Sequence, residues 1–143
     1  MDITSNHVWW SEFDTYKVGT TRNSCSKMHR IHVKYFEEDD FSHEGIYEVG
    51  GRTKDTFEVV LYELERLRKL FNESHEKKYW RAMIELLPMS YNLRATITMS
   101  YENVVNIIHQ RENHKLDEWN VFCDTMLEKL PYLKEIMEYD KTN

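Results

Sequence analysis

The chain has 143 residues, with 25 acidic and 19 basic side chains, so its net charge is −6. This length fits a single domain, and a hydrophobic content of 41% with only four glycines and two prolines excludes a disordered or fibrous chain. No apolar run approaches the roughly 20 residues of a membrane-spanning helix, and the excess of acidic side chains disfavours binding to the phosphates of nucleic acids.

The first residues lack the basic and apolar segments of a secretion signal, so we expect a cytoplasmic protein. Cys25 and Cys123 lie far apart in such a chain, which favours reduced thiols over a disulfide. We expect one domain over residues 1–143, in which 1–36 form a strand and a polar loop, 37–51 an acidic loop, and 52–143 a mainly helical part with one short strand.

The front of the chain is predicted to form a strand and then a loop. Residues 3–13 include Trp9, Trp10 and Phe13, and such aromatic and β-branched mixtures are typical of strands. Residues 14–29 are small and polar. This stretch is either a ligand-holding loop or a solvated connector, and the sequence alone leaves both interpretations open.

The acidic loop contains four consecutive carboxylates, from Glu37 to Asp40. Contiguous acidic residues cannot all converge on one ion, so a solvated run of charge is favoured over a metal site. Gly50 and Gly51 predict a turn before the next helix.

The rest of the chain is predicted to be mainly helical. Apolar residues at three- and four-residue steps predict a helix over 53–72. A second helix over 76–86 ends before Pro88, which lacks an amide hydrogen, and alternating polarity over 93–100 predicts a short strand. Three further helices are predicted over 101–112, 116–130 and 132–139.

Two residues give local detail to this pattern. Ser100, with Asn103 three residues later, is a partial signal for the start of a helix. Cys123 lies on the apolar side of its helix and is predicted to be a small core residue. Strands at the front and helices behind indicate the α+β class, with a small, mostly antiparallel sheet packed against several helices.

The familiar motifs of several enzyme classes are absent from the sequence, among them the zinc-protease, P-loop and dinucleotide-binding motifs. Cys25, His29 and His32 lie close in sequence, but no second set of ligands follows, so we expect no metal site. In the helix over 101–112, Asn106 shares one side with Gln110, and Arg111 closes the last turn. Arg111 could also serve only to complement the helix dipole, and Asn106 could be a plain surface residue.

The segment from Leu87 to Trp119 resembles the C-terminal half of flavin-dependent thymidylate synthases. In that family a Leu-Pro pair ends a helix, a strand carrying Arg and Thr follows, and the next helix presents an Asn and, five positions later, an Arg. The spacing matches without a gap from Leu87 to Arg111 and slips by about one residue before Trp119. The helix from Phe57 to Phe71 lies where the family has its long helix.

The front of the chain can be aligned with the signature of the same family. That signature runs Arg-His-Arg, two residues, Ser, one residue, Asn-Glu, one residue, Ser, one residue, Arg-Tyr. Residues 16–29 keep its small polar frame but not its arginines and histidine, whose charge Lys17 and Arg22 could replace in part. This stretch and residues 113–119 resemble a divergent, largely phage-borne branch, and the family's N-terminal third is expected to be missing.

The resemblance implies roles for individual residues. Arg111 matches the arginine that holds the uracil of dUMP and polarises it for methylation, so it would be the catalytic residue. Ser24, Ser26 and Arg81 would bind the substrate with it; Arg81 lies one turn before Ile84, where the family has a phosphate-contacting arginine. The FAD cofactor would be bound by Asn106, His114, Lys17 and Asn23.

The resemblance therefore implies a partial thymidylate synthase-like fold and the methylation of dUMP with FAD, methylenetetrahydrofolate and NADPH. The sites would lie between the subunits of a homo-oligomer. The altered signature motivates an alternative, a non-catalytic, phage-type acidic protein of the same fold that binds a nucleotide or inhibits a host protein in the host cytoplasm. A third interpretation is a homo-oligomeric structural domain. We expect no bound metal, and no membrane or nucleic-acid partner.

Overall fold

The computed structural model describes residues 1–24 and 28–142 and has both helices and strands, so the predicted α+β class is confirmed. In chain order, the elements are β1 (Asp2–Asn6), α1 (His7–Phe13), β2 (Thr20–Ser24), the 3-10 helices η1 (Met28–Arg30) and η2 (Glu38–Asp40), α2 (Glu44–Val49), α3 (Gly51–Ser74), α4 (Lys77–Leu86), β3 (Asn92–Met99), α5 (Tyr101–Arg111), α6 (Asp117–Lys129) and α7 (Leu133–Thr142). Among these described residues, no helix is long and apolar enough to cross a membrane.

The three strands form one small antiparallel sheet, as predicted, and their order in it is β1-β3-β2. Met1 and Ile97 exchange backbone hydrogen bonds of 2.7 Å in both directions, the arrangement of an antiparallel pair. Along β3, Ala95 and Ile97 are buried while Thr96 is exposed. The alternating polarity over 93–100 therefore predicted this strand correctly.

The chain divides into two compact units. Unit 1 comprises residues 1–3, 9–23 and 95–143, and unit 2 comprises residues 4–8 and 24–94.

Unit 1 has an aromatic core. The Trp9 ring lies 4.7 Å from Trp119 and 5.1 Å from Phe13, measured between ring centroids, and these three side chains are almost fully buried. The predicted strand over 3–13 is wrong beyond residue 6, where α1 begins. The reason is tertiary: a helix places Trp9 and Phe13 on one face, where both pack against Trp119, and this burial outweighs the strand preference of aromatic residues.

Three further predictions for unit 1 have clear outcomes. Residues 20–24, which were predicted to be loop, form β2, because they pair with β3 at the edge of the sheet. Ser100 caps α5 as predicted, since its Oγ accepts a hydrogen bond of 3.3 Å from the Asn103 amide. Cys123 is buried on α6, also as predicted, and this burial raises the pKa of its thiol to about 11.

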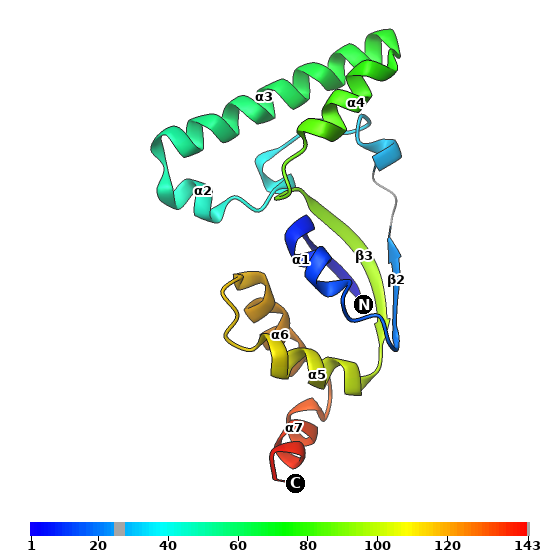
Figure 1. Ribbon diagram of the computed structural model, residues 1–143, viewed down its shortest axis with the longest axis vertical. Coiled ribbons are helices and arrows are strands. Elements are labelled where there is room, and N and C mark those ends of the chain that lie inside the picture. Colours follow the sequence, from blue (N-terminus) through cyan, green and yellow to red (C-terminus); the bar gives the residue numbers. More distant parts are fainter. Residues whose placement is uncertain (25–27, 143) are drawn as a thin grey trace. The chain divides into compact units, whose positions relative to one another are not determined.

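Unit 2 is built on the long helix α3 and on α4, which folds back beside it (Figure 1). Its core is formed by the side chains of Phe41, Phe57, Leu64, Leu67 and Met83. The predicted helices over 53–72 and 76–86 are confirmed, and α3 ends at Ser74, where the following residue, His75, caps the helix with a left-handed φ of 56°.

The segment predicted as an acidic loop is partly helical. Its four carboxylates lie in and beside the short helix η2, where Lys34 Nζ donates a hydrogen bond of 2.8 Å to Glu37. The helix α2 follows because Ile46 and Tyr47 pack against the core of unit 2, which a purely solvated loop would not do. Gly50 does form the predicted turn, with a φ of 64°, between α2 and α3.

Leu64 is fully buried in unit 2, so we expect Leu64→Ala to lower the free energy of unfolding by about 2–5 kcal/mol. Urea unfolding followed by circular dichroism measures this change. Val49→Ala is the control, because Val49 is 72% exposed and its truncation should change stability by less than about 0.5 kcal/mol. Equal effects of the two substitutions would contradict this description of the core.

Candidate functional site

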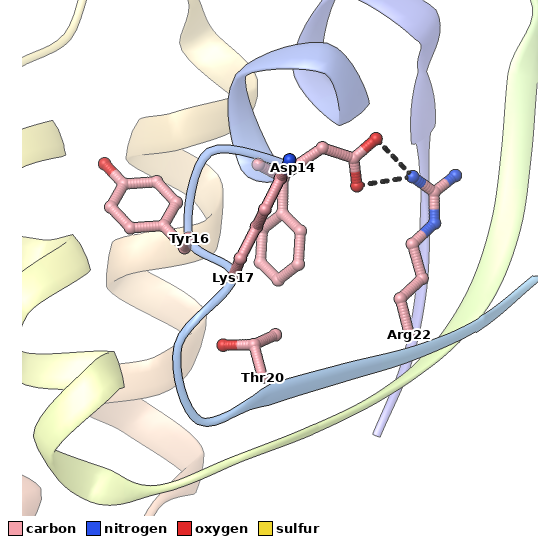
Figure 2. A pocket seen from close by; sticks show the side chains of 6 residues that line it. Asp14, Tyr16, Lys17, Thr20 and Arg22 are labelled. Carbon is pink, nitrogen blue, oxygen red and sulfur yellow. Dashed lines mark hydrogen bonds and ion pairs between the residues drawn. The ribbon is translucent and has the colours of Figure 1, made fainter.

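Unit 1 contains a cavity of about 360 Å³ beside the end of α1 and the start of β2. This volume lies within the range of small-molecule sites. In Figure 2 the paired side chains of Asp14 and Arg22 lie on one side of the view and Tyr16 on the other, with Thr20 below them. The cavity is lined by Phe13, Asp14, Tyr16, Lys17, Thr20 and Arg22.

Arg22 is held rigidly in the cavity wall. Its Nη1 donates to both carboxylate oxygens of Asp14, at 2.7 and 2.8 Å. Its guanidinium carbon lies 4.1 Å from the centroid of the Trp10 ring, a cation–π contact. The Nε atom is buried and has no hydrogen-bond partner among residues 1–24 and 28–142. One donor of a fixed guanidinium is therefore unused.

Two other side chains add donors to the same cavity. The Thr20 hydroxyl is buried and finds no hydrogen-bond partner in the described part of the chain. The Lys17 ammonium forms no ion pair there either. The charged residues that line the cavity are thus two cations, Lys17 and Arg22, and one carboxylate, Asp14. The wall of the cavity therefore carries a net positive charge, although the protein as a whole is acidic.

Gly19 shapes the turn between Lys17 and Thr20. Its φ of 71° lies in the left-handed region, which side chains rarely adopt. A Cβ atom at this position would also lie 2.6 Å from Nδ2 of Asn103, a side chain of α5. The turn that brings the cavity's donors together therefore requires glycine and lies directly against α5.

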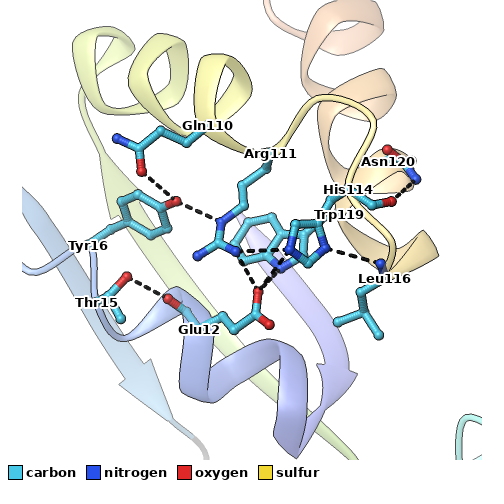
Figure 3. A network of polar contacts seen from close by, with 9 residues as sticks. All are labelled: Glu12, Thr15, Tyr16, Gln110, Arg111, His114, Leu116, Trp119 and Asn120. Atoms are coloured by element: carbon cyan, nitrogen blue, oxygen red, sulfur yellow. Dashed lines mark hydrogen bonds and ion pairs between the residues drawn. The ribbon is translucent and has the colours of Figure 1, made fainter.

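Tyr16 connects the cavity to a network of polar contacts in the same unit. Its ring lines the cavity, and its hydroxyl accepts a hydrogen bond of 2.8 Å from Nε of Arg111. The same hydroxyl donates to Oε1 of Gln110 at 3.1 Å. Figure 3 shows this chain of contacts. The position of the Tyr16 ring is thereby fixed by the end of α5.

Arg111 is itself held by several contacts within unit 1. Its Nη1 donates to Oε2 of Glu12 at 2.6 Å, and its guanidinium lies over the Trp119 ring at 4.7 Å. Trp119 Nε1 donates to the same Glu12 oxygen at 2.7 Å. The Arg111 side chain is only 17% exposed. These contacts tie α1 to the end of α5 and to α6.

His114 completes this network. Its Nδ1 accepts a hydrogen bond of 3.1 Å from the Leu116 amide, so a neutral ring carries its hydrogen on Nε2. That nitrogen lies 3.7 Å from Oε2 of Glu12 and 3.2 Å from Nη1 of Arg111. His114 Nε2 and Arg111 Nη1 are both donors, and they lie close together because both face the carboxylate of Glu12. Asn120 holds the loop in place by donating to the His114 carbonyl at 2.9 Å.

The arginines expected to bind the substrate lie in different units. Arg111 contacts His114 in unit 1, whereas Arg81 lies on α4 of unit 2, exposed and paired with Glu85 at 3.3 Å. Ser24 is the last residue of β2, and Ser26 lies outside the described residues.

The residues expected to bind FAD have separate surroundings. Lys17 lines the cavity, and His114 uses both ring nitrogens within the network around Glu12. Asn23 on β2 and Asn106 on α5 are exposed. No hydrogen bond or ion pair joins any two of the four within the described part of the chain.

Glu12 and Thr20 were not identified from the sequence. Glu12 fell in the segment predicted as a strand, where its contacts with Arg111 and Trp119 could not be foreseen. Had residues 7–13 been interpreted as a helix, Glu12 would have been expected near Trp9 and Phe13 on the same side of that helix. Nothing in the local sequence marks the buried hydroxyl of Thr20. The described residues also contain no cluster of three side chains suited to a metal ion.

We expect Arg111→Ala to lower the free energy of unfolding by about 1.5–3 kcal/mol, because it leaves the carboxylate of Glu12 without its charged partner. Arg81→Ala is the matched control, and its exposed ion pair should contribute less than about 1 kcal/mol. Urea unfolding of both variants tests this difference. Unchanged stability of Arg111→Ala would mean that the network around Glu12 does not support the fold.

Comparisons with known proteins assign no family to this geometry. No family model matches the chain, and no curated protein or solved structure matches it. The cavity of unit 1 and its unused donors are therefore the basis for a functional proposal.

Proposed function

We propose that the protein binds a small phosphorylated ligand, a nucleotide such as dUMP, in the cavity of unit 1. One observation carries this proposal: the Thr20 hydroxyl and Arg22 Nε are buried without partners, in a cavity that also holds Lys17. A buried donor without an acceptor costs about 1–3 kcal/mol. Phosphate oxygens would satisfy both donors and would be attracted by the two cations.

The remaining lining residues favour a nucleotide over a simple anion. The Tyr16 ring offers an aromatic face for a base, and it is held in place by Arg111 and Gln110. Asp14 is half exposed and can accept hydrogen bonds from sugar hydroxyls while it pairs with Arg22. The lining thus offers an aromatic ring for the base, a carboxylate for the sugar and two cations for the phosphate of a nucleotide.

In this proposal the chain is a divergent, non-catalytic relative of the flavin-dependent thymidylate synthases, with part of their fold. The cavity supports the binding role. The contacts that already occupy Arg111 support the loss of catalysis. Its guanidinium contacts Glu12, Tyr16 and Trp119 and is not among the residues that line the cavity. An arginine held in this way positions Tyr16 instead of polarising a uracil ring.

Thr20→Val gives a sharp test of the binding role. The change removes a buried hydroxyl that has no partner in the described structure, so the free protein should be as stable as the parent or more stable. If that hydroxyl binds phosphate, the affinity for dUMP should fall on the order of tenfold. Isothermal titration calorimetry and thermal unfolding measure the two effects on the same sample.

Lys17→Ala should weaken dUMP and inorganic phosphate alike, because it removes a charge from the cavity. Lys129→Ala, on the last turn of α6 and away from the lining, is the control and should change neither affinity. Saturable binding of dUMP that is unaffected by Thr20→Val and Lys17→Ala would place the site elsewhere. A protein that binds neither compound would contradict the proposal.

Thymidylate synthesis is the second candidate, and it is favoured by the contact between Arg111 and the cavity residue Tyr16. It differs from the first proposal in needing FAD. Under the first proposal, the purified protein is colourless and leaves the fluorescence of added FAD unchanged. Bound flavin in the visible spectrum, together with methyl transfer to dUMP, would overturn the non-catalytic proposal in favour of the enzyme.

A further inference from the structure

The helix α3 of unit 2 has two opposite faces. One face packs Phe57, Leu64 and Leu67 into the core of the unit. The other carries a row of exposed residues at alternating steps of three and four, the spacing of a coiled-coil seam. We call this row the α3 stripe, and it consists of Arg52, Asp55, Val59, Tyr62, Arg66, Lys69 and Glu73.

The centre of the α3 stripe is apolar and its ends are charged. Val59 is 65% exposed and Tyr62 is 74% exposed, near the middle of a helix of 24 residues. At the ends of the stripe, no charged side chain forms an ion pair within the described part of the chain; these are Arg52, Asp55, Lys69 and Glu73.

The other charged side chains of α3 form ion pairs within the helix. Lys54 pairs with Glu58 at 3.7 Å, and Arg66 pairs with Glu63 at 2.7 Å. The unpaired charges are thus confined to the end positions of the stripe.

The order of these charges fits a second copy of the same helix laid antiparallel. With a two-fold axis at Tyr62, Asp55 lies seven positions before the axis and Lys69 seven positions after it, so each faces the other across the pair. Arg52 lies ten positions before the axis and Glu73 eleven after it, so these two come within one residue of facing each other. A parallel pair would instead bring equal charges together.

The apolar centre fits the same arrangement. Tyr62 would meet Tyr62 of the second copy at the axis. Val59 would face Arg66, whose aliphatic stem can cover it while its charged end stays with Glu63. Every position of the α3 stripe therefore has a suitable partner in one register.

We infer that the α3 stripe is a contact surface for a second copy of this chain, packed antiparallel about a two-fold axis at Tyr62. An α-helix of 24 residues is roughly 36 Å long. Only Val59 and Tyr62 of the α3 stripe are apolar, so the pair would bury little apolar surface. The dimer is therefore weak, dependent on concentration, and sensitive to salt because its outer contacts are ion pairs.

The dimer is tested by sedimentation of the full chain over a range of concentrations, at low and at high salt. We expect association that weakens with salt and is lost in Tyr62→Glu, which places two carboxylates together at the axis. Circular dichroism should show an unchanged fold, because Tyr62 is exposed. Glu48→Lys, an exposed charge change on α2 outside the stripe, is the control and should leave association intact.

Charge exchange tests the register. Asp55→Lys and Lys69→Asp should each weaken self-association on the order of tenfold, because each replaces two attractive contacts with repulsive ones. A one-to-one mixture of these two variants should associate like the parent, since every facing pair then has opposite charges, and so should the double variant. A monomer at all concentrations, a dimer that Tyr62→Glu leaves intact, or a mixture that fails to associate would contradict the inference.

Discussion

One carboxylate oxygen, Oε2 of Glu12, accepts hydrogen bonds from both Arg111 and Trp119, and His114 lies 3.7 Å from it. These donors come from parts of the chain about a hundred positions away from Glu12 in sequence. Because the carboxylate is only 31% exposed, removing its partners would leave a charge with little access to water. The contacts therefore hold α1 against α5 and α6 and close the aromatic core of unit 1.

The cavity depends on this anchor through Tyr16. Arg111 donates to the Tyr16 hydroxyl, so the arginine that stabilises the fold also fixes one wall of the proposed ligand site. The turn at Gly19, pressed against Asn103, fixes the other side by carrying the chain back into β2. Binding and stability are coupled here: Arg111→Ala should weaken both, whereas Thr20→Val should separate them.

The sequence was a good guide where the pattern was long and periodic. The helices α3 to α7 and the strand β3 were predicted because their apolar residues repeat over many positions. It failed at α1, since the choice between strand and helix there is decided by the distant Trp119. The role of Glu12 could not be predicted either, because its partners Arg111 and Trp119 are also distant in sequence. Lys17 and Arg22 were expected to replace part of the positive charge of the family signature, and in the structure both line one cavity.

In this proposal the cavity beside β2 binds the phosphate of a nucleotide while Arg111 stays in its contacts with Glu12. The sharpest check is backbone amide NMR during a titration with dUMP. We expect saturable shifts at the amides of residues 16–22 and unchanged amides along α4, including Arg81. Saturable shifts centred on α4, or no shifts at millimolar dUMP, would contradict it.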